Sequence, residues 1–183
     1  MNNLANSYSS LGLQERALVI HENALEFRRR ALPPNHPDIG SSMNSLAVTY
    51  RALGRHEEAL AMQENALEFR RRALPPNHPD ICSSMNNLAN IYRALGRLED
   101  ALAMQENALE LQRRILPPNH IDIAVSLFNA SLSYARVAGG VPRAYECACE
   151  ALVIWQAALP PSHPHLQMGQ ENIRLLKLKL QQQ

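Results

Sequence analysis

The chain has 183 residues and a formal net charge of +1, and aromatic residues make up only 5% of it. This balance of charge gives no general attraction to nucleic acid or to an anionic membrane. No apolar run approaches the roughly 20 residues needed to span a bilayer, and the amino terminus lacks the pattern of a signal peptide. Three cysteines, an odd number, do not make a disulfide framework. We therefore expect a cytoplasmic protein without membrane contact.

The sequence repeats itself with a period of 42 residues. Residues 43–84 and 85–126 are identical at 31 of 42 positions without a gap, and residues 1–42 match 43–84 at 30 of 42. A fourth copy, 127–164, has drifted further and contains one inserted residue near Gly139. Such self-similarity is typical of stacked-repeat architectures. We expect a single array over residues 1–183, with repeats at about 1–42, 43–84, 85–126 and 127–164 and a capping helix at about 164–181.

Each repeat is predicted to form two helices, and the second copy shows this most clearly. Gly54 ends its first helix, and Pro75-Pro76 ends the second, because proline lacks the N–H that a helix needs. The string Asn77-His78-Pro79-Asp80 then begins the next helix, with a polar capping residue, a proline in the first turn and an aspartate near the amino terminus. The first helix has apolar residues at the spacing of one helical face, which are Met43, Leu46, Ala47, Tyr50 and Leu53.

Small residues recur at the same positions of every repeat. Alanine at these points allows two helices to approach closely, and a single helix pair cannot bury its apolar face alone. The repeats are therefore expected to stack on one another. The recurring alanines of the first three copies are Ala5, Ala17, Ala24, Ala47, Ala59, Ala66, Ala89, Ala101 and Ala108.

This pattern resembles the tetratricopeptide repeat (TPR) in its long, 42-residue form. The family signature is present as Leu46-Ala47 followed by Tyr50, then Gly54 and the alanines of the second helix. The string from Asn86 to Tyr92 is similar to the repeats of kinesin light chains. The resemblance implies an all-α, right-handed superhelical solenoid of antiparallel helix pairs. It also implies a non-enzymatic scaffold that binds a protein or peptide partner.

The resemblance further implies where a ligand binds. In the family, the first helices line a concave groove, and residues beside the Leu-Ala pair contact a bound peptide. The predicted peptide-binding residues of this sequence are therefore Asn2, Asn6, Asn44, Val48, Arg51, Asn86, Asn87, Asn90, Arg93, Phe128, Asn129 and Leu132.

The chemistry of these residues fits peptide capture. An asparagine side chain offers a donor and an acceptor that match a peptide backbone, and an arginine can bind a carboxylate through two hydrogen bonds. The groove is expected to be polar in the first three repeats and apolar at Phe128 and Leu132. In the alternative interpretation, the asparagines are solvated helix positions retained through duplication of one ancestral unit.

Two further functions stay open. The near-identity of the repeats favours copies that stack or exchange helices through their terminal helices, which would give a homo-oligomer. The arginine runs of the second helices could form a basic edge for nucleic acid, although nearby glutamates favour simple charge complementation at the helix ends. These runs are Arg28 to Arg30, Arg70 to Arg72, and Arg113-Arg114.

Catalysis and metal binding are not expected. Stacked repeats lie about 10 Å apart, whereas metal ligands lie about 2 Å from one ion, so a histidine that recurs once per repeat indicates packing. No nucleophile with a base, paired carboxylates or phosphate-binding loop is present. We expect no enzyme activity, no metal and no other cofactor. The recurring histidines are His36, His78, His120 and His163.

Overall fold

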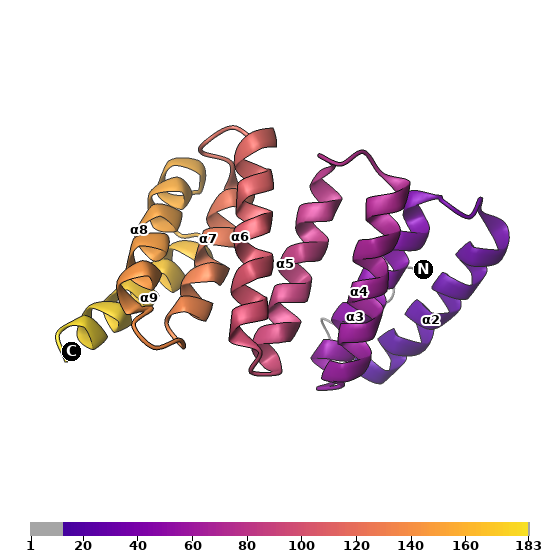
Figure 1. Ribbon diagram of the computed structural model, residues 1–183, viewed down its shortest axis with the longest axis horizontal. Coiled ribbons are helices and arrows are strands. Elements are labelled where there is room, and N and C mark those ends of the chain that lie inside the picture. The colour runs from indigo at the N-terminus through magenta and orange to yellow at the C-terminus, as the bar shows by residue number, and fades with distance from the viewer. Residues whose placement is uncertain (1–12, 183) are drawn as a thin grey trace. The chain divides into compact units, whose positions relative to one another are not determined.

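The computed structural model describes residues 13–182, which form eight helices and no strand (Figure 1). The chain divides into two compact units, Met1–Leu95 and Gly96–Gln183. That both units belong to one continuous array stays a prediction. Unit 1 contains α2 (Gln14–Ala31), α3 (Pro37–Ala52), α4 (His56–Ala73) and α5 (Pro79–Ala94), and unit 2 contains α6 (Leu98–Ile115), α7 (Ile121–Tyr134), α8 (Val141–Ala158) and α9 (Pro164–Leu180).

Four of the helices begin at a histidine that caps its own helix. The Nδ1 atom of His78 accepts a hydrogen bond of 3.1 Å from the backbone N–H of Asp80. This contact satisfies one of the N–H groups that have no partner inside a helix. Helix starts therefore explain the recurrence of the histidines. The same bond is made at His36, His120 and His163.

Glycines occupy the tight turns between the first and second helices. Gly54 follows α3 with a φ of 74°, a left-handed conformation that costs glycine little. Gly140 precedes α8 for another reason: a Cβ atom there would lie 2.2 Å from the backbone oxygen of Tyr134. The inserted residue of the fourth copy thus lies in a turn where the chain passes very close to the end of α7.

In unit 1, α3 packs against α2 and α4, and α5 packs against α4. Leu18, Leu25, Met43 and Leu46 form much of the core, and Ala66 is fully buried beside them. Ala17, Ala47 and Ala59 are also fully buried. Alanine at these sites brings the helix backbones together, and a larger side chain would have to displace a neighbouring helix.

In unit 2, α7 packs between α6 and α8, and α8 also packs against α9. The main core surrounds Trp155, which is 1% exposed, and includes Ile123, Leu127 and Leu166. Leu176 of α9 belongs to a second buried cluster with residues of α8. Burying a leucine of this size stabilises the fold by about 1.5–3 kcal/mol. The segment predicted to cap the array is therefore held by apolar contacts from both ends of α9.

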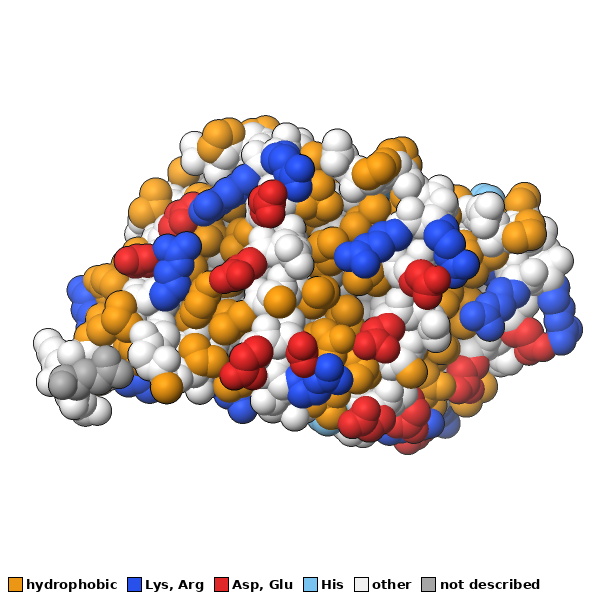
Figure 2. All heavy atoms as spheres, in the orientation of Figure 1, with side chains coloured by type: hydrophobic (Ala, Val, Ile, Leu, Met, Phe, Trp, Pro, Cys, Tyr) orange, Lys and Arg blue, Asp and Glu red, His pale blue; other side chains and the backbone are white. Residues whose placement is uncertain are grey.

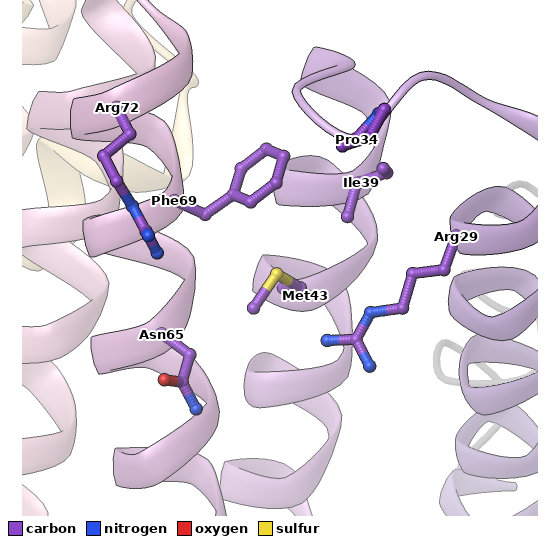
Figure 3. Close-up of a pocket in the computed structure, with 7 residues that line it drawn as sticks. All are labelled: Arg29, Pro34, Ile39, Met43, Asn65, Phe69 and Arg72. Atoms are coloured by element: carbon purple, nitrogen blue, oxygen red, sulfur yellow. The ribbon is translucent and has the colours of Figure 1, made fainter.

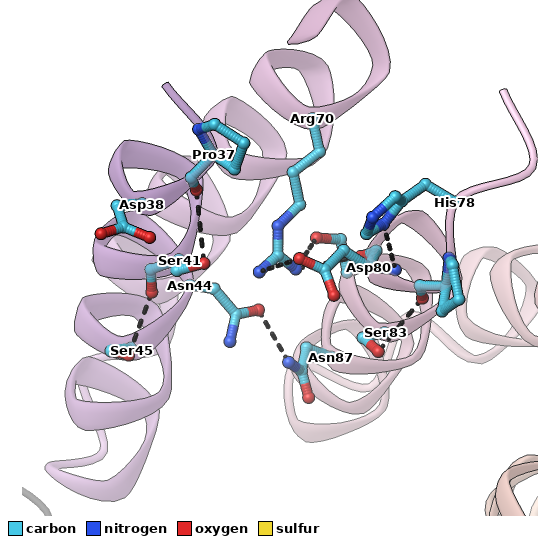
Figure 4. Close-up of polar contacts among 12 residues, drawn as sticks. Pro37, Asp38, Ser41, Asn44, Ser45, Arg70, His78, Asp80, Ser83 and Asn87 are labelled. Carbon is cyan, nitrogen blue, oxygen red and sulfur yellow. Dashed lines mark hydrogen bonds and ion pairs between the residues drawn. The ribbon is translucent and has the colours of Figure 1, made fainter. Parts of the chain in front are cut away.

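A polar contact recurs where a second helix meets the first helix of the next repeat. Arg70 of α4 is 5% exposed, and its Nη1 donates to the backbone oxygen of Asp80 at 2.9 Å and to Oγ of Ser84 at 2.8 Å (Figure 4). Its Nη2 lies 3.5 Å from Oδ2 of Asp80. We call this arginine, aspartate and serine the junction triad. Arg28, Asp38 and Ser42 form the same triad between α2 and α3.

The last junction uses different chemistry at the same three positions. Trp155 of α8, His165 and Gly169 of α9 stand where the triad has arginine, aspartate and serine. The Trp155 and His165 rings pack with centroids 4.8 Å apart. A Cβ atom on Gly169 would lie 3.4 Å from the indole and 3.2 Å from Leu152. Gly169, at the position of the serine, thus leaves room for the large ring of Trp155, at the position of the arginine.

A tyrosine to glutamate hydrogen bond adds to the contact between neighbouring repeats. The hydroxyl of Tyr50 donates to Glu22 at 3.0 Å, and Tyr92 donates to Glu64 at the same distance. Tyr134 makes the same bond to Glu106, and burial together with this carboxylate raises the pKa of Tyr134 to about 12. The tyrosine of the repeat signature therefore both fills space and fixes the register of adjacent helices.

Candidate peptide-binding surface

The first helices α3 and α5 of unit 1 carry most of the predicted binding residues. Leu46 and Ala47 of α3 and Leu88 and Ala89 of α5 point into the core and are almost completely buried. The predicted residues beside them are partly or fully exposed, as their spacing on the helix requires. They are Asn44, Val48, Arg51, Asn86, Asn87, Asn90 and Arg93.

Asn44 and Asn87 join the two first helices. Oδ1 of Asn44 accepts a hydrogen bond of 2.8 Å from Nδ2 of Asn87 (Figure 4). The same oxygen accepts 3.1 Å from Nε2 of Gln63, a fully buried residue of α4 that also donates to the backbone oxygen of Ser84. Asn44 and Asn87 therefore have a structural role that neither interpretation of the sequence included, and their contact with a ligand stays a prediction.

This network leaves the outer half of each amide unused. Within residues 13–182, the Nδ2 group of Asn44 and Oδ1 of Asn87 have no hydrogen-bond partner. In Figure 4 both atoms point away from Arg70, on the same side of the asparagine pair. The surface therefore presents one side-chain donor beside one side-chain acceptor, the combination that a peptide group can satisfy.

The neighbouring positions add an apolar contact and positive charge. The side chain of Val48 is 36% exposed, a position at which a ligand could cover it. Arg51 is exposed and has no ion-pair partner among the described residues. Nη2 of Arg93 donates to Oδ1 of Asn90 at 3.0 Å, so this pair is already linked. Asn86 is half-buried, and its Oδ1 atom is buried within the packing.

The predicted residues of unit 2 have a different environment. Phe128 is 8% exposed and packs against Trp155 with ring centroids 5.3 Å apart. Its ring therefore has little surface left for a ligand, and sequence reasoning missed this contact because the partner lies on another helix. Leu132 packs against the same core, and Asn129 is half-buried. Asn2 and Asn6 lie outside the described residues.

The arginine runs are largely occupied by contacts within the protein. Arg28 and Arg70 belong to junction triads, and Arg30 and Arg72 pair with glutamates one helical turn away. On the faces that Figure 2 shows, acidic and basic side chains are interspersed in each unit. These contacts favour charge complementation along the helices over a continuous basic edge.

The described part of the chain contains no group of three or more histidine, cysteine or acidic residues that could hold a metal ion. Cys82 and Cys147 are buried and Cys149 is half-buried, and all three are free thiols. Burial raises the pKa of the Cys147 thiol, which lowers its reactivity. No helix within residues 13–182 has the length and hydropathy needed to cross a membrane.

Comparison with known proteins identifies the repeat. The profile of the tetratricopeptide repeat matches three consecutive segments, residues 1–38, 39–80 and 81–122. The chain belongs to the tetratricopeptide repeat family. TPR arrays mediate protein–protein interactions and are generally non-enzymatic scaffolds. A search of curated protein sequences found no match to this TPR chain.

Solved structures confirm the predicted TPR-like solenoid fold. The nearly identical TPR-like repeats of a kinesin light chain-like protein from Podosopora anserina match with a TM-score of 0.82 at 24% identity, over 100% of this chain and 86% of that one. BtubC (BKLC) from P. vanneervenii gives 0.82 at 25% identity, over 94% and 68%. Apo RapI gives 0.76 at 14% identity, and the match covers 97% of this TPR chain but 47% of RapI.

Proposed function

We propose that the chain binds an extended peptide of a partner protein on the first helices α3 and α5 of unit 1. The asparagine pair carries this proposal, because Asn44 and Asn87 bond to one another and still present a donor and an acceptor. Their mutual bond also holds both amides in one orientation before a ligand arrives. A preorganised site loses less side-chain entropy on binding than a flexible one.

The neighbouring residues suggest the character of the peptide. Val48 offers an apolar contact beside the amides, and Arg51 offers a guanidinium that has no ion-pair partner within residues 13–182. A guanidinium binds a carboxylate through two parallel hydrogen bonds. We therefore expect a peptide whose backbone faces the asparagine pair and whose acidic side chain faces Arg51. Phe128 does not belong to this surface, because its ring packs against Trp155 inside unit 2.

The substitution Asn44→Asp tests the proposal with little disturbance of the fold. An aspartate keeps an oxygen that can accept from Gln63 and Asn87, but it replaces the outward N–H donors with a second oxygen. A peptide array identifies peptides that bind the unmodified chain, and calorimetry then measures their affinity for the variant. This affinity should be at least about tenfold weaker, which corresponds to about 1.4 kcal/mol. Unchanged affinity would remove the asparagine pair from the binding surface.

Asn23→Ala is a suitable control, because Asn23 is exposed on the second helix α2 and lies outside the proposed surface. The Asn23→Ala variant should bind the partner peptides with the affinity of the unmodified chain. Arg51→Gln should weaken the binding of acidic peptides. It should leave unchanged the affinity for matched peptides in which Gln or Asn replaces the acidic residue. Equal loss for both kinds of peptide would show that Arg51 acts on the fold instead of the ligand.

Self-association is a second candidate, favoured by an apolar stripe on α9. Met168, Leu175 and Leu178 are 49%, 46% and 44% exposed, although large apolar side chains usually lie inside. A second copy could cover this stripe. Light scattering over a range of concentrations should then give a mass that rises with concentration and that falls in Leu175→Lys. A monomer at every concentration would exclude this candidate.

A further inference from the structure

A pocket of about 490 Å³ lies between α2, α3 and α4 of unit 1 (Figure 3). Ile39 and Met43 of α3 are almost completely buried and form its floor, and the ring of Phe69 lies along one side. Arg29 of α2 reaches in from the opposite side, and Asn65 of α4 lies below the ring (Figure 3). We refer to this site as the α3 floor pocket. Its size is within the range of ligand-binding clefts.

Arg29 differs from the arginines beside it. Arg28 donates to Ser42 within its junction triad, and Arg30 pairs with Glu26. Arg72, at the rim of the pocket, lies 3.4 Å from Glu68. Within residues 13–182, the guanidinium of Arg29 has neither a hydrogen bond nor an ion pair. The pocket therefore combines an apolar floor with an uncompensated positive charge.

Unit 2 contains the same position with its charge compensated. Arg113 aligns with Arg29, because the two residues are two repeats apart, and Glu150 aligns with Asn65 after the one-residue insertion. Nη2 of Arg113 donates to Oε1 of Glu150 at 2.7 Å. In unit 2, a second helix thus supplies the carboxylate that spans this face. Unit 1 has an amide at that position, and Arg29 has no carboxylate partner among the described residues.

We propose that the α3 floor pocket binds an acidic side chain of a partner polypeptide. The carboxylate occupies the place that Glu150 takes in unit 2, accepting hydrogen bonds from the Arg29 guanidinium and from the Asn65 amide. An apolar residue next to it in the partner lies on Ile39, Met43 and Phe69. The occupant is therefore a segment in which an acidic and a large apolar residue are adjacent. This site shares no residue with the asparagine pair and does not depend on the proposed function.

The substitution Asn65→Glu tests the assignment by copying unit 2. A glutamate at this position would pair with Arg29 and fill the anion position from within. The probe is a fluorescein-labelled, terminally blocked peptide, Gly-Ser-Glu-Leu-Ser-Gly, with variants in which Phe or Met replaces Leu. Fluorescence anisotropy should show binding to the unmodified chain and at least about tenfold weaker binding to Asn65→Glu, or about 1.4 kcal/mol. The same peptides with Gln in place of Glu should bind equally weakly.

Asn23→Glu is the matched control, because it makes the same change of charge on α2 outside the pocket. It should bind the probe as the unmodified chain does. Arg29→Gln gives a second test that does not add an acidic group, and circular dichroism verifies that each variant is folded. The proposal is overturned if Asn65→Glu or the Gln peptides bind with unchanged affinity, or if no Glu peptide binds at about 1 mM. Asn44→Asp should leave the affinity for the probe unchanged, which distinguishes this pocket from the surface that contains the asparagine pair.

Discussion

Arg70 illustrates how a charged residue becomes part of the fold. The side chain lies almost entirely out of water, and its Nη1 contacts two oxygens of α5, the backbone oxygen of Asp80 and the hydroxyl of Ser84. Hydrogen bonds from a charged donor are each worth about 1.5–3 kcal/mol. Its neighbour Arg71 is exposed. Two adjacent arginines of one run therefore have different roles.

We expect Arg70→Ala to lower the free energy of unfolding by about 2–4 kcal/mol, because it leaves buried polar groups of α5 without their donor. Arg71→Ala should change it by less than about 0.5 kcal/mol. Urea titration of both variants measures the difference. Equal effects of the two substitutions would mean that the buried contacts of Arg70 contribute nothing beyond its surface charge.

His21 predicts a dependence of stability on pH. The residue is 2% exposed, and burial lowers its pKa below the ordinary value of 6.5. At pH well above 6.5 the imidazole is neutral in both states, and it adds no pH dependence. As the pH falls below 6.5, the unfolded chain takes up a proton that the folded chain resists, so stability declines until the lower folded pKa is passed.

Gln63 occupies the position of His21 in the next repeat, so His21→Gln is the natural comparison. The difference in unfolding free energy between pH 7 and pH 5 should be smaller in this variant than in the unmodified chain. Urea titrations at the two pH values provide the measurement. An identical pH dependence of both proteins would mean that His21 does not titrate differently on folding.

At the scale of helices, short-range patterns predicted most of the fold. The spacing of the apolar residues and the positions of proline and glycine predict where the helices begin and end, because these signals act within a few residues. Arg70 was missed as a buried residue, although it follows Ala66 by four positions and so continues the buried face of α4. Phe128 was placed on the surface by alignment with Asn44. Its burial depends on Trp155, which lies on another helix and which no local pattern connects to it.

The terminal helix α9 should be required for the stability of unit 2. Leu166 and Leu176 are buried, and His165 packs on Trp155. We expect that ending the chain after Ser162 lowers the melting temperature, shifts the emission of Trp155 to longer wavelength, and increases the binding of an apolar dye. Unchanged melting and emission in the shortened chain would show that α9 does not shield the core.

At the scale of the whole molecule, each unit has its own buried core. Met43 and Leu46 lie in that of unit 1, whereas Trp155 lies in that of unit 2. Trp155 is the single tryptophan of the chain, so its fluorescence reports on unit 2 alone. Circular dichroism, in contrast, reports on the helices of both units. Stability in repeat proteins is approximately a sum of local terms.

This arrangement predicts that unfolding need not occur in one step. In Arg70→Ala, which weakens unit 1, the urea midpoint from circular dichroism should fall further than the midpoint from Trp155 fluorescence. Coincident midpoints in the variant, shifted by the same amount, would indicate a single cooperative transition.

The contacts between α8 and α9 determine which segments of the chain can be exchanged between repeat copies. Trp155 lies before the Leu159-Pro160-Pro161 linker, whereas His165 and Gly169 lie after it. A crossover in this linker would bring the indole against an aspartate and a serine from another copy, and it would leave both without the arginine that contacts them in a junction triad. A crossover in the glycine turn before α8 would instead transfer all three residues together. The exchangeable segment of this protein is therefore a second helix with the first helix that follows it.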